Sequence, residues 1–263
     1  MPKKRIKVKK DNLKVGIIFS VVIALLIGFS LIGKLASVLE QGKYDDNYPM
    51  SLKVEGKYGV QFLSIFPKEH EISVLNVSGG REVSESLAIA PEAEVIAGAL
   101  SVEPSDTSSF FHAILRNEEV KTNLTAVDKF RLYLLSKSIA GEDVTVEDVS
   151  VSGEAADKII SSLFSDSGIT SEGLRVEVVN ATGVYGIGNK VARIISNIGT
   201  DVVFVSTADN TEEECVIYYQ DDKTYTVKRL ARTLGFRTVK NAKRTISDIT
   251  VVIGENGLKS INP

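Results

Sequence analysis

The feature that most constrains this chain is a run of nineteen residues without a charge, from Val15 to Gly33. At about 1.5 Å per helical residue the run spans roughly 28 Å, close to the hydrocarbon core of a bilayer. A secretory signal has a shorter apolar core and a small-residue cleavage site, whereas Lys34 follows this run without such a pattern. We therefore expect a transmembrane helix over residues 15–33; the alternative is a buried core helix behind a basic tail.

The residues before this run predict its orientation. Residues 1–14 hold seven Lys or Arg and one Asp, and such basic clusters stay on the cytoplasmic side of a membrane. The sequence therefore predicts a single-pass, type II protein of the cell membrane. Residues 1–14 form its cytoplasmic basic tail, and residues 35–263 are extracytoplasmic.

The charge balance and the rare residue types exclude several classes of function. The chain has a net charge of −3 and residues 1–34 carry +7, so residues 35–263 carry −10. An acidic exported part disfavours nucleic acid as a partner. The single cysteine, Cys215, cannot form an internal disulfide, so the exported part depends on apolar cores. His70 and His112 lie far apart without a neighbouring Cys or His, and we expect neither a metal site nor a cofactor.

The exported part has the pattern of two small α/β domains. Residues 34–50 are polar and indicate a stalk, and the Gly/Ser/acidic stretch 166–173 indicates a linker. These boundaries leave a domain at 51–165 and a second domain at 174–257.

Local patterns in the first of these domains predict a hairpin and several helices. The β-rich runs 58–66 and 71–77 flank a turn with Pro67. Thr125 with Asp128 three residues on is a variant of the capping box and predicts the start of a helix. We also expect a helix at 106–116, a strand at 144–151 and a helix at 154–164. The stripe expected to pack on the core comprises Val127, Phe130, Leu134 and Ser138, widened by Leu135 and Ile139.

The last ninety residues predict the order β-α-β-β-α-β. Two amphipathic helices, each ended by a glycine, alternate with four apolar strands, the last of them DITVVIG. This order is that of a ferredoxin-like split β-α-β sandwich, with both helices on one face of a four-stranded sheet. The fold class predicted for the exported part is therefore α/β, of the α+β kind.

A glycine-rich loop after the first of these strands is the candidate binding site. The loop does not fit a nucleotide motif, because the dinucleotide fingerprint lacks its last glycine and Lys190 is followed by Val rather than Ser or Thr. A tight turn with positive φ explains the glycines, with side chains of the loop bonding its amides. The exposed start of the following helix can instead hold a small anion or a sugar carboxylate. The candidate binding residues are Asn180, Thr182, Gly183, Gly186 and Gly188.

The C-terminal pieces resemble, in order, the C-terminal domain of LytR-CpsA-Psr cell-envelope proteins. That domain begins V-x-V-x-N-G/A-T-G and continues with a helix that ends in a glycine. A tyrosine-bearing strand, an L-A-x-x-L-G helix and a V-x-V-V-x-G end follow. The chain reads RVEVVNATG, CVIYY, RLARTLG and DITVVIG at the corresponding places, within residues 174–257.

The middle part is similar, over a shorter stretch, to the catalytic domain of the same family. Residues 59–77 match the strand, turn and strand with which that domain opens. The family then has Ser-Ile-Pro-Arg-Asp, where the Arg and Asp act on a polyprenyl-pyrophosphate-linked glycopolymer. This chain has Asn-Val-Ser-Gly-Gly at 76–80 and Arg81 afterwards, and between residues 36 and 173 its other arginines are Arg116 and Arg131.

The resemblance implies an envelope protein with a reduced middle domain. Transfer of a pyrophosphate-linked group needs clustered cations, and three scattered arginines do not provide them. We therefore expect a non-catalytic protein that binds or organises cell-wall glycan, such as peptidoglycan or a wall glycopolymer, or other envelope proteins. The alternative is a phosphotransferase that attaches a lipid-linked glycopolymer to peptidoglycan, with Arg81 as the best candidate for a catalytic residue.

Overall fold

The computed structural model describes residues 10–40, 42–57, 59–98, 100–117, 120–241 and 246–258. The chain divides into two compact units, residues 1–42 and residues 43–263. Part of the predicted basic tail, residues 1–9, lies outside the described residues.

The first unit contains a single long helix, α1 (Lys10–Glu40). The predicted span 15–33 lies within it, and its described large apolar side chains between Ile17 and Phe29 are exposed. Judged over the residues that the structure describes, no helix is long and apolar enough to cross a membrane.

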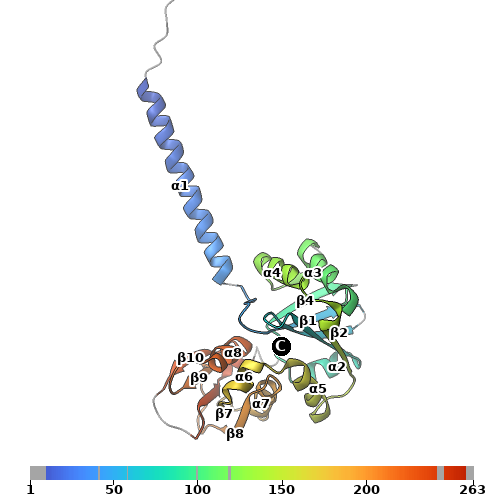
Figure 1. Ribbon diagram of the computed structural model, residues 1–263. Coiled ribbons are helices and arrows are strands. Elements are labelled where there is room, and N and C mark those ends of the chain that lie inside the picture. The colour runs from blue at the N-terminus through green and yellow to red at the C-terminus, as the bar shows by residue number, and fades with distance from the viewer. Residues whose placement is uncertain are drawn as a thin grey trace, which may run out of the picture. The chain divides into compact units, whose positions relative to one another are not determined.

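The second unit begins with a six-stranded mixed sheet (Figure 1). Its strand order is β5-β4-β1-β2-β3-β6: β1, β2 and β3 are antiparallel neighbours, whereas β4 runs parallel to β1 and β6 parallel to β3. The hairpin of β2 and β3 confirms the one predicted from the sequence. The strands are β1 (Met50–Gly56), β2 (Gly59–Phe66), β3 (Glu71–Val77), β4 (Ala93–Gly98), β5 (Lys121–Thr122) and β6 (Val144–Val149).

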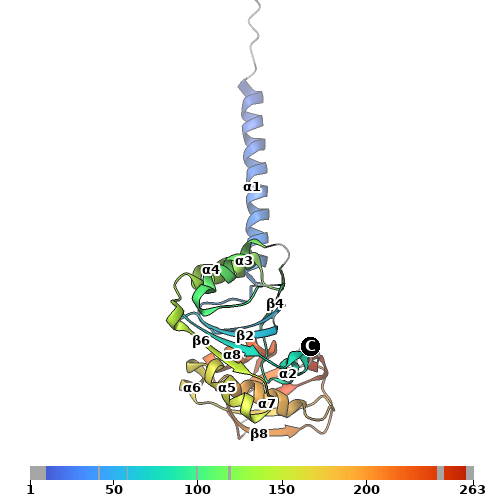
Figure 2. The ribbon, with the colours of Figure 1, turned by 90° about the vertical axis from the view of Figure 1, so that its right-hand side faces the viewer.

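Helices cover both faces of this sheet (Figure 2). Alternation along β2 sends Leu63 to a core with α3 and α4, and Phe62 to a core with α5. The helices predicted near 106–116 and 154–164 are confirmed. The elements are α2 (Gly80–Ser86), α3 (Thr107–Arg116), α4 (Ala126–Ser136) and α5 (Glu154–Phe164), with short 3₁₀ turns at Pro104–Asp106 and Gly141–Asp143.

The capping box predicted at the start of α4 is confirmed, but the buried face of this helix is not the predicted one. Thr125 and Asp128 bond each other's backbone N–H. Phe130 and Leu134 are about half exposed, whereas Asp128 and Leu132 are buried. The carboxylate of Asp128 turns inward because it accepts hydrogen bonds from the backbone of residues 43 and 44.

A second mixed sheet of five strands follows. Its order is β10-β9-β11-β7-β8; β8 and β11 run parallel to β7, and β10 runs parallel to β9. The elements are α6 (Ser167–Glu172), β7 (Arg175–Asn180), α7 (Ile187–Asn197), β8 (Asp201–Thr207), β9 (Val216–Tyr219), α8 (Tyr225–Leu234), β10 (Arg237–Lys240), β11 (Ile249–Ile253) and a 3₁₀ turn at Glu255–Gly257.

The ferredoxin-like topology expected from the sequence is wrong. In that fold the strands on either side of each helix are separated by another strand, whereas β7 and β8 are direct neighbours, as are β9 and β10. Part of the difference arises at β10, a strand of four residues with a cation at each end, which has no apolar run that would predict it. Because β10 pairs with β9, the last strand β11 inserts between β9 and β7.

The linker predicted at 166–173 is a packed helix, α6, with a buried cap. Asp166 is buried and accepts from the backbone N–H of Gly168. Gly168 is required because a Cβ there would overlap the Tyr225 ring, and Gly173 ends the helix at φ 57°. The Gly/Ser/acidic composition therefore reflects a tight cap and close packing rather than a flexible connection.

The two sheets also share one apolar core. Residues of β2 and β3, of α5 and of α7 and α8 belong to the same buried cluster. In Figures 1 and 2 this layer of helices lies between the two sheets. Residues 43–263 are therefore one folded unit rather than two separate domains.

The stalk predicted at 34–50 is also shorter than expected. Helix α1 continues to Glu40, Tyr44 is buried in the second unit, and Met50 already begins β1. Arg131 on α4 packs its guanidinium over the Tyr44 ring, 5.0 Å from the ring centroid. Packing of Tyr44 thus attaches this polar segment to the fold.

Tyr225 closes the contact between α6 and α8. Its hydroxyl donates to both carboxylate oxygens of Asp166, at 3.0 and 2.9 Å, and its ring stacks on Tyr48 at 5.0 Å. Burial of the hydroxyl, followed by the negative charge of Asp166, raises the pKa of Tyr225. The neutral phenol is thus the form that stabilises the fold.

We expect the Tyr225→Phe variant to lose less thermal stability than the wild type between about pH 8 and pH 11. The folded pKa of Tyr225 is above that of the unfolded chain, so its contribution is complete below about pH 10 and is lost as the pH rises further. Melting temperatures measured across this range test the prediction. Tyr185→Phe, at an exposed tyrosine, should show the same decrease in melting temperature as the wild type. If Tyr225→Phe also showed the same decrease as the wild type, the prediction would be contradicted.

Candidate functional site

The glycine-rich loop joins the end of β7 to the start of α7. Strand β7 alternates buried and less buried residues and ends at Asn180, whose side chain is buried. Gly183 and Gly186 have φ values of 72° and 85°, which side chains other than glycine rarely adopt. Gly188 allows close packing, because a Cβ there would lie 3.1 Å from the Val205 side chain.

Two polar side chains hold the loop, as the sequence predicts. The amide of Asn180 donates to the carbonyl of Val184 at 2.8 Å, and its oxygen accepts from the backbone N–H of Thr182 at 3.1 Å and from the Thr182 hydroxyl at 2.7 Å. The Thr182 hydroxyl in turn accepts from the N–H of Val184 at 3.0 Å. The loop is therefore preorganised by its own residues.

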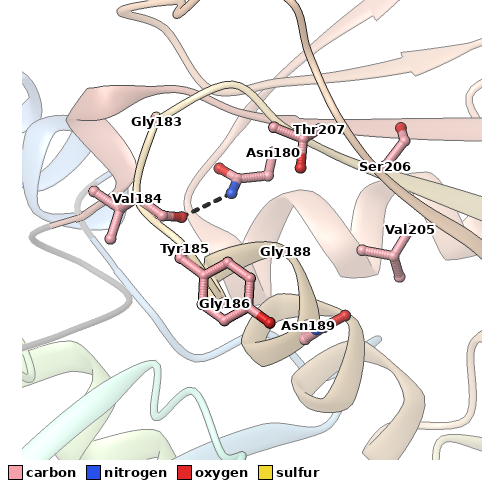
Figure 3. Close-up of a pocket in the computed structure, with 10 residues that line it drawn as sticks. All are labelled: Asn180, Gly183, Val184, Tyr185, Gly186, Gly188, Asn189, Val205, Ser206 and Thr207. Carbon is pink, nitrogen blue, oxygen red and sulfur yellow. Dashed lines mark hydrogen bonds between the residues drawn. The ribbon is translucent and has the colours of Figure 1, made fainter.

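A cavity of about 300 Å³ opens between this loop and the carboxyl end of β8 (Figure 3). Four of the five candidate residues line it, whereas Thr182 is buried and supports the loop without lining the cavity. The lining residues are Asn180, Gly183, Val184, Tyr185, Gly186, Gly188, Asn189, Val205, Ser206 and Thr207.

The chemistry of this cavity is neutral and polar. None of the described residues that line it is Asp, Glu, Lys, Arg or His. Amides and hydroxyls of Asn180, Asn189, Ser206 and Thr207 provide donors and acceptors, and the side chain of Tyr185 is 99% exposed at the rim. Hydroxyl and amide partners beside an exposed aromatic ring suit an uncharged, hydroxyl-rich ligand better than a free anion.

The sequence does not predict that residues of β8 and of the loop tip line the cavity. The sequence pattern predicts a split arrangement, in which another strand separates the two strands of each helix-connected pair. Because β8 is instead the direct parallel neighbour of β7, the carboxyl ends of both strands meet at one edge of the sheet, a common place for ligand sites in α/β folds. The polar pair Ser206 and Thr207 at the end of an apolar strand was the available signal.

The arginines of the first sheet do not form a cationic pocket. Arg81 is exposed on α2 and pairs with Glu85 at 2.8 Å; Arg131 on α4 pairs with Asp46. Arg116 is exposed in the last turn of α3. The helices α3 and α4 cover one face of the sheet and α2 packs on the other core, so Arg81 lies on the opposite face from Arg116 and Arg131.

A cavity of about 140 Å³ lies near the start of α2, where the family resemblance places the transfer site. It is lined by parts of β2, β3 and the segment after β4, and none of its described lining residues is charged. Among the described residues, no group of three His, Cys, Asp or Glu side chains is arranged to hold a metal ion.

A third cavity, of about 280 Å³, lies beside Tyr48, Lys68 and Tyr225. Two of its acidic side chains, Asp166 and Glu172, have structural partners. Glu172 accepts from the backbone N–H groups of Tyr225 and Thr226 at the start of α8. Burial acts to raise the pKa of Glu172, but hydrogen bonds from Thr226 and Tyr225 outweigh it and leave the pKa lowered. This carboxylate therefore caps a helix.

Comparison with known proteins supports the family resemblance predicted for the C-terminal part of the chain. The family model described as LytR cell envelope-related transcriptional attenuator matches residues 173–256, which run from the end of α6 to the last 3₁₀ turn. The predicted resemblance of residues 174–257 to this domain is thereby confirmed, and it associates the chain with cell-envelope-related proteins. No curated protein and no solved structure matches the chain. The resemblance of residues 51–165 to a catalytic domain stays a prediction.

Proposed function

We propose that this protein is a membrane-anchored, extracytoplasmic component of the cell envelope that binds cell-wall glycan without catalysing a reaction on it. The observation that carries the proposal is the neutral, polar cavity at the carboxyl ends of β7 and β8, with the exposed ring of Tyr185 at its rim. It lies within the part of the chain that matches a cell-envelope family.

The proposed anchor is residues 15–33. These residues carry no charge, belong to the 31-residue helix α1 and follow seven basic residues. With the basic tail on the cytoplasmic side, the fold of residues 43–263 lies outside the cell membrane, where a wall glycan is accessible.

The proposed glycan contact follows from the chemistry of the cavity. A sugar ring presents hydroxyls that pair with amide and hydroxyl side chains, and an apolar face that packs on an aromatic ring. Asn189, Ser206 and Thr207 provide the polar partners, and Tyr185 provides the ring. About 300 Å³ is at the small end of the range for ligand pockets, so one or two sugar units of a longer glycan would enter it.

The positions of the arginines support a non-catalytic role. Transfer from a pyrophosphate requires cations that converge on the transferring group. Arg81 lies on the opposite face of the first sheet from Arg116 and Arg131, and both Arg81 and Arg131 pair with carboxylates. Turnover of a polyprenyl-pyrophosphate-linked glycan by the purified protein with a divalent metal would overturn this part of the proposal.

We expect Tyr185→Ala to weaken retention of the full-length protein on purified peptidoglycan by about two- to tenfold, because one aromatic contact contributes roughly 0.5–1.5 kcal/mol. A co-sedimentation isotherm with increasing amounts of peptidoglycan measures the effect. Phe130→Ala removes an aromatic ring that is 50% exposed on α4 and serves as the matched control. Unchanged retention of Tyr185→Ala would exclude the cavity as the glycan-binding site. If the wild type itself were not retained, docking to an envelope protein would be favoured.

A further inference from the structure

Helix α4 presents apolar side chains to solvent on the face away from its core. Phe130 and Leu134 are 50% and 49% exposed, whereas Leu132 is buried in the core on that side of the first sheet. Residues four or three positions apart in a helix lie on the same face, so Phe130, Leu134 and the exposed Lys137 are neighbours. These three residues form the α4 surface patch, an apolar pair with a cation at one end.

The surroundings of the α4 surface patch are basic, unlike the proposed exported part as a whole. Residues 120–139 contain four Lys or Arg and one Asp and carry +3, whereas the exported part carries −10. Arg131 pairs with Asp46, so the charge beside the patch comes from Lys129 and Lys137. Phe and Leu side chains flanked by cations suit an anionic lipid surface, where apolar groups enter the headgroup region and cations stay at the phosphates.

Helix α4 is also bonded to the first residue of the folded unit. The uncharged run ends at Gly33, and α1 continues to Glu40, about 10 Å further along a helix. The three residues to Lys43 add at most about 10 Å. The backbone N–H of Lys43 donates to Asp128, in the first turn of α4, at 3.1 Å. The start of α4 therefore lies within roughly 25 Å of the hydrocarbon core, and lipid headgroups fill the first 5–8 Å or so of that distance.

We propose that the α4 surface patch docks on the outer surface of the membrane that holds the anchor. Phe130 and Leu134 lie among anionic lipid headgroups, and Lys137 lies at their phosphates. This inference rests on the proposed anchor at residues 15–33. In Figures 1 and 2, α4 and β8 lie at opposite ends of the fold of residues 43–263. Docking through α4 therefore directs the cavity at the end of β8 away from the membrane, towards the wall glycan.

Quenchers attached to lipid headgroups test the docking in the full-length protein. Cys215 is replaced by Ser, and a fluorescent probe is attached to Ser138→Cys, at an exposed residue next to the patch. The protein is reconstituted into vesicles of equal amounts of phosphatidylcholine and phosphatidylglycerol that contain a spin-labelled lipid. We expect the spin label to lower the fluorescence at position 138 about twofold or more. The same probe on Phe204→Cys, 48% exposed on β8, should keep its fluorescence.

Removing the two apolar side chains tests whether the α4 surface patch causes the quenching. Phe130→Ser combined with Leu134→Ser should reduce the quenching at position 138 to the level at position 204. Ile96→Ser, at a residue that is 51% exposed on β4, is the matched control and should leave the quenching unchanged. Circular dichroism confirms that each variant is folded.

The outcomes separate this inference from the proposed function. Full-length protein that does not float with the vesicles would overturn the anchor and the docking together. Protein that floats without quenching at position 138, or with quenching that persists after the double substitution, would overturn the docking alone. A probe that is shielded from water but not quenched by lipid would also overturn it and would indicate a protein partner. Retention on peptidoglycan is measured separately and does not depend on α4.

Discussion

Replacing Arg229 by Met is expected to lower the free energy of unfolding of residues 43–263 by about 3–5 kcal/mol. The Arg229 side chain is 1% exposed and pairs with Glu92; its Nε lies 3.3 Å from Asp166, a charge contact without hydrogen-bond geometry. Removing the guanidinium leaves two buried carboxylates without their cation. Urea denaturation followed by circular dichroism measures the change.

Arg237→Met is the matched control for this prediction. Arg237 pairs with Glu214 at 2.6 Å, but both side chains are more than half exposed, and such pairs contribute about 1 kcal/mol or less. Neutralising the partner in the double variant Arg229→Met with Glu92→Gln should recover part of the loss. Equal changes in the free energy of unfolding for Arg229→Met and Arg237→Met would show that the buried ion cluster stabilises the fold no more than an exposed ion pair does.

Asp128→Ala is expected to destabilise the same unit by about 2–4 kcal/mol. Asp128 is 1% exposed, and its carboxylate accepts from the backbone N–H groups of Lys43, Tyr44 and Thr125 at 3.0–3.1 Å. Without the carboxylate, α4 loses its capping box and buried N–H groups lose their partner. Urea denaturation measures the loss, and tryptic cleavage after Lys43 reports release of the segment.

Asp106→Ala provides the comparison for this carboxylate. Asp106 also caps a helix, α3, but it is exposed and accepts only from Ser109 among the described residues, at 3.3 Å. Its loss should cost about 1 kcal/mol and leave cleavage after Lys43 unchanged. If Asp128→Ala behaved in the same way, the attachment of residues 43–44 would not depend on this carboxylate.

The features that sequence predicted correctly are those set by neighbours along the chain. The hairpin of β2 and β3 follows from alternating apolar residues around Pro67, and the start of α4 follows from Thr125 and Asp128. The loop after β7 is held by Asn180 and Thr182 within a few residues. Each of these depends on local geometry, which a short stretch of sequence contains.

The features that sequence missed depend on contacts between distant residues. Glu92 and Arg229 are 137 positions apart, so the sequence does not show that they pair. The composition around Asp166 therefore indicated a linker, whereas the fold buries Asp166 in an ion cluster with these two residues. Strand β4 became a strand through parallel pairing with β1, about forty residues earlier. The β8 side of the cavity was missed for the same reason, since it depends on which strand lies beside β7.

The buried face of α4 shows why hydropathy alone misleads at such positions. An apolar pattern favours Phe130 and Leu134 as the core side and places Asp128 in solvent. In the fold the backbone N–H groups of Lys43 and Tyr44 require an acceptor, and Asp128 supplies it. Satisfying these buried donors decides which side of the helix faces inward.

Lys43 has a mechanical consequence if residues 15–33 form the proposed membrane anchor. Its backbone N–H donates to Asp128 on α4, its ammonium group donates to the Glu92 carbonyl ahead of β4, and its own carbonyl accepts from Arg232 on α8. A pulling force on the preceding residues is therefore divided among three elements at the first residue of the folded unit. The load is therefore shared at once by helices α4 and α8, which pack on different cores of the folded unit.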